Sequence, residues 1–219
     1  MLQGFFKGVH SIIFPRNCQI CRRGPLADHQ HLCAQCFVSI PWVNPSSHIP
    51  LSGITHSWAA CQYQEPFTTL IHRFKYNGST SLKKLFGFLL NHYISTHHLP
   101  INDIDLIIPI PLHATKLRER GFNQSLLLAT SVGEHFQRPI DHTILERTQL
   151  TQSQTALSLK DRWTNQQGTF RITHPLLITG KHVLIVDDLM TSGATTLTAA
   201  YELKKAGALR VSILTLAKA

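Results

Sequence analysis

The carboxyl-terminal third of the chain carries the clearest pattern of apolar positions. Residues 183–186 form an unbroken apolar run, which is typical of a strand buried on both faces of a parallel sheet. From Thr195 onward, apolar and small residues return with helical spacing, and Gly207 is placed to end that helix. Residues 209–216 are again apolar and predict a final strand. This segment therefore predicts a strand, a helix and a second strand.

The same alternation continues upstream. The pattern predicts strands over 58–63, 105–112 and 143–145, and helices over 66–74, 82–94 and 122–136. Pro109 and Pro111 stiffen the end of the second of these strands. Because strands alternate with helices, we expect an α/β fold with a parallel sheet, right-handed crossovers and helices on the flanks. Ligands of such sheets bind outside the carboxyl ends of the strands.

Two acids and a small polar loop follow the apolar run. Asp187 and Asp188 end the predicted strand, and the loop consists of Thr191, Ser192, Gly193, Ala194 and Thr195. A phosphate binds well at a helix N-terminus, where hydroxyls add donors and glycine lets the backbone approach. Carboxylates repel phosphate and instead suit sugar hydroxyls or a ligand-borne Mg²⁺. The pattern predicts a site for a phosphorylated sugar, without the spacing of a P-loop.

A second group of polar residues follows the strand predicted over 105–112. Pro111, Leu112 and His113 are followed by three cations, Lys116, Arg118 and Arg120, before the next helix begins. A strand end that meets cations and a helix start favours anions by the same physics. An exposed basic turn is the alternative. Further on, residues 147–168 form a long polar stretch in which Arg147, Gln152 and Arg162 are candidates for a lid, with an ordinary surface loop as the alternative.

Four of the five cysteines form two pairs with the same spacing. They are Cys18 and Cys21, then Cys33 and Cys36. Two C-x-x-C pairs predict a structural zinc site with four thiolates. His29 or His31 could replace one thiolate, and two disulfides are the competing interpretation in an oxidising compartment. Cys61 stands apart and is expected to be a small buried residue.

The domain organisation follows from these features. Residues 1–57 are expected to hold an amphipathic helix, the cysteine module and a Pro-rich segment (residues 40–57) that links it to a second domain over 58–219. The first helix, residues 1–14, is expected to dock on its own domain, with a membrane-surface helix as the alternative. It lacks the features of a signal peptide, and no apolar run reaches the length of a membrane span. A cytoplasmic location is expected.

The charge balance favours an anionic partner. The chain of 219 residues has a formal net charge of +9, which suits nucleic acid, a phosphorylated substrate, or both. The candidates for nucleic-acid contact are Arg22, Arg23, Arg73, Lys75, Lys83, Lys84, Lys116, Arg118 and Arg120. Solvated faces would give the same clusters. The cysteine module, with Arg22 and Arg23, is either a structural staple or a surface that contacts nucleic acid.

Residues 186–195 carry a resemblance to a known family. The pattern V-D-D-x-x-[ST]-[ST]-G-x-T after an apolar strand resembles the phosphoribosyl-pyrophosphate (PRPP) loop of type I phosphoribosyltransferases. The resemblance implies that Asp187 and Asp188 bind the ribose hydroxyls of PRPP, which carries Mg²⁺. The loop from Thr191 to Thr195 would then hold the 5-phosphate. It also implies that Pro111, Leu112 and His113 form the pyrophosphate loop and that a flexible loop closes over the ligand.

Several motifs together narrow the resemblance. The two cysteine pairs, Phe-Lys-Tyr-x-Gly at 74–78, Pro-x-Pro-Leu at 109–112 and Arg-x-Arg-Gly-Phe-Asn-Gln at 118–124 occur in this order before the PRPP loop. In this order they are similar to the ComF competence family. Membership implies a cytoplasmic protein of natural transformation that handles incoming single-stranded DNA, together with other competence proteins.

Three functions remain in competition. The chain could be a competence protein with a PRPP-binding site, an active phosphoribosyltransferase of unknown acceptor, or a non-catalytic adaptor of the DNA-uptake machinery. No segment has the features of a nucleobase-binding hood. Amidophosphoribosyltransferases have an additional glutamine-hydrolysing domain with an N-terminal cysteine, whereas Leu2 stands here, so that activity is not expected.

Overall fold

The structure is a computed structural model that describes residues 17–27, 31–47, 51, 53–77, 80–149 and 168–219. Its centre is a sheet of four strands, β1 (His56–Gln62), β2 (Leu106–Pro109), β5 (His182–Met190) and β6 (Arg210–Lys218). Their order across the sheet is β1-β6-β5-β2, and every neighbouring pair is parallel. The predicted parallel α/β sheet is confirmed.

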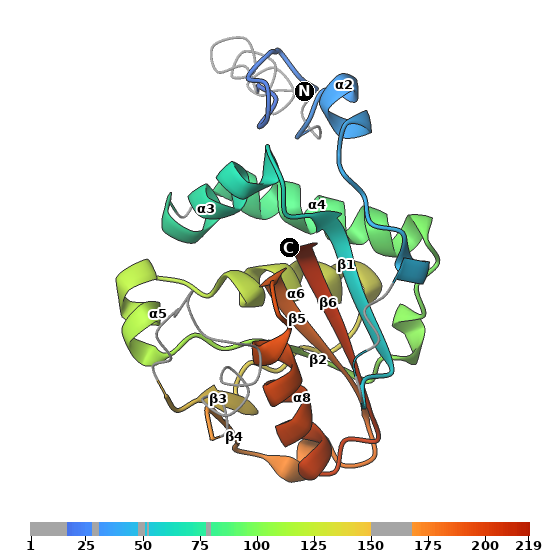
Figure 1. The fold of residues 1–219 in the computed structure, drawn as a ribbon, viewed down its shortest axis with the longest axis vertical. Helices are drawn as coiled ribbons and strands as arrows, with labels where there is room; N and C mark the ends of the chain where they lie inside the picture. Colours follow the sequence, from blue (N-terminus) through green and yellow to red (C-terminus); the bar gives the residue numbers. More distant parts are fainter. Residues whose placement is uncertain (1–16, 28–30, 48–50, 52, 78–79, 150–167) are drawn as a thin grey trace, which may run out of the picture.

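Alternate residues of the central strands face two different sets of helices. In β5 and β6, Leu184, Val186, Leu214 and Leu216 belong to one apolar cluster. That cluster includes α3 (Phe67–Asn77), α4 (Thr80–Thr96) and α6 (Gln124–Phe136). Neighbouring residues of the same strands face the other way and join a second cluster with α8 (Ala194–Lys205). They are Val183, Ile185, Val211 and Ile213. The strands are thus buried on both faces, with α8 on one side and α4 and α6 on the other (Figure 1).

The strand expected at 143–145 is not part of the central sheet. It is β3 (Leu145–Arg147), which pairs antiparallel with β4 (Phe170–Ile172) in a separate ribbon. An ion pair between Arg171 and Glu146, 2.6 Å long, joins the exposed face of the ribbon. Leu145 and Phe170 point into the cluster beneath α8. Side-chain alternation over three residues was too short to show which sheet this strand would join.

Other element boundaries also differ from the pattern. Helix α3 continues to Asn77, beyond the expected end at residue 74, β2 already ends at Pro109, and β5 continues through the two acids to Met190. A short helix that was not predicted, α5 (Ala114–Arg120), follows β2 and ends at Gly121, whose φ is +76°. The remaining elements are α2 (Ala34–Val38) and three 3₁₀ turns, η1 (Pro45–Ser47), η2 (Ile101–Asp103) and η3 (Pro175–Leu177).

The cysteine module is anchored to the sheet domain. Residues 41–43 run antiparallel to β1, with the Gln62 N–H donating to the Pro41 carbonyl and the Val43 N–H to the Ala60 carbonyl. Ile40 and Val43 are buried. Cys18, Leu32 and Cys36 share an apolar cluster with α4, which lies between the module and the sheet (Figure 1). The first part of the segment expected to be a linker is therefore packed on β1.

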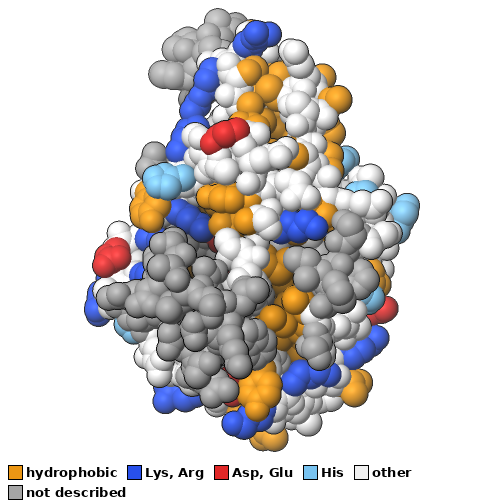
Figure 2. Space-filling view, viewed as in Figure 1, with side chains coloured by type: hydrophobic (Ala, Val, Ile, Leu, Met, Phe, Trp, Pro, Cys, Tyr) orange, Lys and Arg blue, Asp and Glu red, His pale blue; other side chains and the backbone are white. Residues whose placement is uncertain are grey.

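The surface is mixed in character. Figure 2 shows Lys and Arg side chains in several separate groups and few acidic side chains on the face that it draws. Among the described residues, no helix is both long and apolar enough to cross a membrane. Cys61 is fully buried in β1, as its isolated position in the sequence predicted.

Candidate functional site

The acid pair occupies the carboxyl-terminal half of β5. The Ser125 hydroxyl, at the start of α6, donates to Asp187 Oδ1 over 2.7 Å, and the Asp188 N–H donates to the same oxygen over 2.9 Å. Asp188 is buried and its Oδ2 lies 3.2 Å from Lys75 Nζ, at the end of α3. Both carboxylates are therefore held in fixed positions by groups from α3 and α6.

Burial has a marked effect on Asp187. Loss of solvent, followed by the neighbouring charge of Asp188, raises the pKa of Asp187 from 3.8 to about 7. The Ser125 hydroxyl, the Asp188 N–H and the charge of Lys75 act in the opposite direction and limit the rise. Close to neutral pH, this carboxyl group is thus poised between its two protonation states, and hydrogen-bond donors of a ligand would favour the ionised state.

The loop after the acids ends in a glycine with an unusual backbone conformation. Gly193 has a φ of +74° and precedes the first residue of α8. A left-handed conformation at this point turns the chain from β5 into the helix, and glycine adopts it without a steric cost. A polar pocket is lined by Asp187 and residues 189–196. The pocket thus joins an acid to the N-terminus of α8, a helix of twelve residues. This arrangement suits a sugar phosphate.

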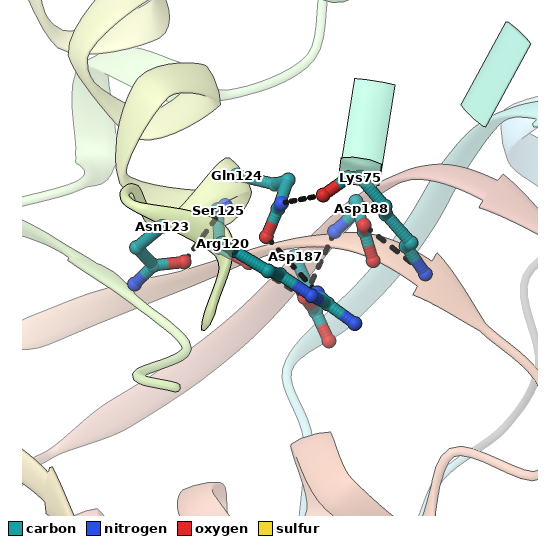
Figure 3. A network of polar contacts seen from close by, with 7 residues as sticks. All are labelled: Lys75, Arg120, Asn123, Gln124, Ser125, Asp187 and Asp188. Atoms are coloured by element: carbon teal, nitrogen blue, oxygen red, sulfur yellow. Dashed lines mark hydrogen bonds and ion pairs between the residues drawn. The ribbon is translucent and has the colours of Figure 1, made fainter. Parts of the chain in front are cut away.

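A second polar network lies across from the acid pair (Figure 3). The side chain of Gln124 is buried, its Nε2 donates to the Lys75 carbonyl over 3.1 Å, and its Oε1 accepts from Arg120 Nη1 over 3.2 Å. Asn123 caps α6 by accepting from the Ser125 N–H and donates to the Ile110 carbonyl. Gln124 therefore links α3, α5 and α6 next to the two carboxylates.

The sequence did not assign a chemical role to Asn123, Gln124 or Ser125. The sequence nevertheless contained a signal for these three residues, because consecutive polar side chains at the start of an apolar helix usually have hydrogen-bond partners. Asn123 bonds the carbonyl after β2, and Ser125 bonds Asp187. Only the folded structure shows that these partners come from segments far away in the sequence.

The predicted pyrophosphate loop follows β2, which pairs with β5. Its register brings Pro109 beside Val186, and the Ile110 N–H donates to the Val186 carbonyl. Pro111, Leu112 and His113 thus leave the sheet next to the acid pair. His113 accepts at Nδ1 from the Thr115 N–H over 3.3 Å and so caps α5. The role of these three residues in binding stays a prediction.

The candidates for a flexible lid fall in two places. Gln152 and Arg162 lie outside the described residues. Arg147 ends β3, so it belongs to a strand, and its guanidinium lies 5.5 Å from the centroid of the Phe170 ring. Burial lowers the pKa of Arg147, and the charge of Asp187 acts in the opposite direction.

The basic residues proposed for nucleic-acid contact separate into two groups. Lys75 and Arg120 belong to the network beside the acids. Burial, followed by the charges of Arg147 and Arg120, lowers the pKa of Lys116. The others lie on the module or on helix surfaces: Arg22, Arg23, Lys84 and Arg118 are exposed, and Arg73 and Lys83 are partly exposed.

The four cysteines of the module are positioned to bind a metal. The Sγ atoms of Cys18, Cys21, Cys33 and Cys36 all lie within 4.8 Å of one another, and those of Cys21 and Cys33 are 3.8 Å apart. A tetrahedral zinc ion with Zn–S bonds of about 2.3 Å requires S–S edges of about 3.8 Å, so the donor set fits. All five cysteines are free, which contradicts the disulfide alternative. His31 is not part of the cluster, and His29 lies outside the described residues.

Comparisons with known proteins agree with this fold. A family model described as a phosphoribosyl transferase domain matches residues 140–219. The DNA utilization protein YhgH of Escherichia coli O157:H7 is 30% identical over 90% of this chain and 87% of its own. Competence protein F of Haemophilus influenzae is 30% identical over 72% and 70%, and competence protein ComFC of Bacillus subtilis is 28% identical over 81% and 67%.

These findings define the chain in two steps. The parallel sheet, the acid pair and the match over residues 140–219 define a protein of the phosphoribosyltransferase fold. The similarity over 72–90% of the chain and the four-cysteine cluster are more specific: the chain belongs to the ComF family of phosphoribosyltransferase-like proteins. The resemblance that the motifs indicated is confirmed.

Proposed function

We propose that this chain acts in the uptake or use of incoming DNA and binds PRPP at the acid pair of β5. The observation that carries the proposal is the pocket that joins Asp187 to the Gly193 turn and the start of α8, in a chain of the ComF family. Asp187 and Asp188 would accept hydrogen bonds from the ribose hydroxyls. Thr191, Ser192, Ala194 and Thr195 would hold the 5-phosphate with hydroxyls and backbone N–H groups.

Magnesium fits this arrangement as an ion that arrives with the ligand. Two carboxylates lie beside the pocket, and Mg²⁺ commonly uses one or two carboxylates with phosphate oxygens and water. When bound, the ion would neutralise charge on the phosphates of PRPP. The chain's own residues would hold the ribose and its phosphate in a fixed orientation. Whether transfer to an acceptor follows would be decided by screening acceptors for pyrophosphate release.

Calorimetric titration with PRPP and Mg²⁺ tests the ligand. Binding is expected for the wild type and is expected to be lost in Asp187→Asn/Asp188→Asn, because two acceptors for ribose hydroxyls lose their charge. The matched control is Asp103→Asn/Asp105→Asn, which removes two charges from exposed positions near β2. Absence of binding to a folded, zinc-loaded wild type would refute the PRPP site, and equal losses in both double variants would refute the role of the acid pair.

The proposed role in DNA handling is supported by the relatives and by charge. The relatives are called competence proteins and DNA utilization proteins, and the net charge of this chain is +9. Arg22 and Arg23 are exposed on the cysteine module. We propose that the module binds structural zinc and that, together with Lys83 and Lys84 of α4, it contacts single-stranded DNA. Residues 1–57 and 58–219 would then be two functional units, and other competence proteins would be partners.

Fluorescence anisotropy with a labelled oligothymidylate tests DNA binding. Affinity is expected to fall at least about tenfold between about 50 and 200 mM salt, since phosphate contacts release counterions. Arg22→Gln/Arg23→Gln is expected to weaken binding and to flatten its salt dependence. Lys204→Gln/Lys205→Gln removes the same charge from the end of α8 and serves as the control. No binding at low salt, or no effect of salt, would contradict the proposal.

A further inference from the structure

One aromatic residue of α4 lies outside the apolar core. Phe88 is 43% exposed, and its neighbours on the same helix face are polar, with Lys84 one turn before it and His92 one turn after it. The core-facing side chains of α4 are almost completely buried: they are Leu82, Leu85, Phe86, Leu89, Leu90, Tyr93 and Ile94. Because burial in the core does not explain this ring, its surroundings at the surface are informative.

Rings from the cysteine module meet Phe88 where the module lies on α4. The ring centroids of His31 and Phe37, both from the module, are each 6.0 Å from the centroid of Phe88. The ring of His92 is also 6.0 Å away and nearly parallel to Phe88, with 24° between the planes. Phe37 lies 5.0 Å and Trp42 5.5 Å from His92. These four neighbours are all partly exposed, so the five rings form an aromatic array that reaches the solvent.

The charges in this part of the chain are mostly of one sign. Residues 29–102, which include α2, α3 and α4, contain four Lys and Arg residues and one acid, Glu65. Lys84 is exposed on the face of α4 that carries the exposed ring, and Arg22 and Arg23 are exposed on the module. Figure 2 shows both hydrophobic and basic side chains on the module. Cations beside exposed rings suit a polyanion that also carries flat apolar groups.

Single-stranded nucleic acid combines these two kinds of group. Its phosphates pair with Lys and Arg, and its unpaired bases stack on aromatic side chains regardless of sequence. An acidic protein segment would match the cations, but it would not require rings in place of other apolar side chains.

We propose that bases of single-stranded DNA stack on Phe88 and on the rings that flank it, His31 and His92. Lys84 and the exposed arginines of the module contact the phosphates on either side. The inference rests on the proposed role in DNA handling and adds the binding mode to it. Affinity then comes from the bases as well as from the phosphate charge.

Two labelled oligomers of equal length and charge separate these contributions: oligothymidylate, and an abasic oligomer with the same sugar–phosphate backbone. By fluorescence anisotropy, the wild type is expected to bind oligothymidylate at least about fivefold more tightly than the abasic oligomer. Phe88→Leu keeps an apolar side chain but removes the ring, so this preference should be lost while the salt dependence stays unchanged. Phe88→Trp should retain the preference. Lys84→Gln should weaken binding of both oligomers alike and flatten the salt dependence.

Tyr201→Leu is the matched control, because Tyr201 is an exposed aromatic residue of α8, on the other face of the sheet. It should change neither affinity, and the zinc content of each variant checks that the module is intact. Equal losses for both oligomers in Phe88→Leu would overturn the inference, because the ring would then act only by docking the module.

The wild type alone separates the two proposals. Equal affinity for the two oligomers would overturn base stacking and leave DNA handling through phosphate contacts standing. Absence of binding to either oligomer at low salt would refute DNA handling and base stacking together. This comparison requires no variant, so it decides the inference even should Phe88→Leu not fold.

Discussion

Asp187→Asn gives the sharpest test of the electrostatics of the site. The raised pKa means that Asp187 stays protonated in the folded protein up to about pH 7, whereas in the unfolded chain it ionises near its ordinary value of 3.8. Between these values the unfolded state binds fewer protons, so the free energy of unfolding falls as pH rises through this window. The stabilisation is fully present below about pH 4 and is lost as pH passes about 7.

The size of the effect follows from the two pKa values. A difference of about three pH units corresponds to an upper limit of about 4 kcal/mol, of which about 2–3 kcal/mol falls between pH 5 and pH 8. Asparagine cannot ionise, and its oxygen can still accept from Ser125 and from the Asp188 N–H. Asp187→Asn is therefore expected to become more stable than the wild type as pH rises, although it loses the proposed ligand.

Urea unfolding at several pH values between 5 and 8, without ligand, measures this difference. Asp103→Asn is the control, because it makes the same chemical change at an exposed position on η2. The difference in unfolding free energy between Asp187→Asn and the wild type should grow with pH, and that between Asp103→Asn and the wild type should stay constant. Parallel curves for all three proteins would refute a raised pKa at Asp187.

Three further predictions concern single positions. Gly193→Ala and Gly180→Ala each place a side chain at a positive φ, +74° and +73° respectively, and should each cost about 1–2 kcal/mol of stability in urea unfolding. Only Gly193→Ala should also weaken PRPP binding in calorimetry. Equal binding losses in the two variants would contradict the role of the Gly193 turn. Cys36→Ser should lose the metal, whereas Cys61→Ser should keep one zinc per chain in elemental analysis. The reason is that Cys36 belongs to the four-cysteine cluster and Cys61 does not. Ser125→Ala should raise the pKa of Asp187 further, since a hydrogen bond that lowers it is removed, and a carboxyl ¹³C titration that stays unchanged would contradict this.

Much of the framework follows from local pattern. The apolar run at 183–186, the two acids and the Gly193 turn predicted a strand, a ligand-binding edge and a helix, and β5 and α8 lie there. Such segments are predictable because burial on both faces demands continuous apolar residues and because a left-handed turn favours glycine. The spacing of the cysteine pairs predicted a metal-binding cluster, because a spacer of two residues lets both thiols of a pair reach one ion.

Contacts between distant segments were decided only by the tertiary structure. Lys75, Gln124 and Asp188 are polar residues on three separate elements, and nothing in their local sequence states that they meet. The antiparallel ribbon of β3 and β4 is a further example, because three-residue strands carry too little alternation to specify a partner. Local pattern thus determined the strands, the turn and the metal ligands, whereas packing of α3, α5 and α6 against the sheet determined which charges surround the acids. The physical reason is that hydrogen bonds and ion pairs depend on distance in space, which the chain's order alone does not fix.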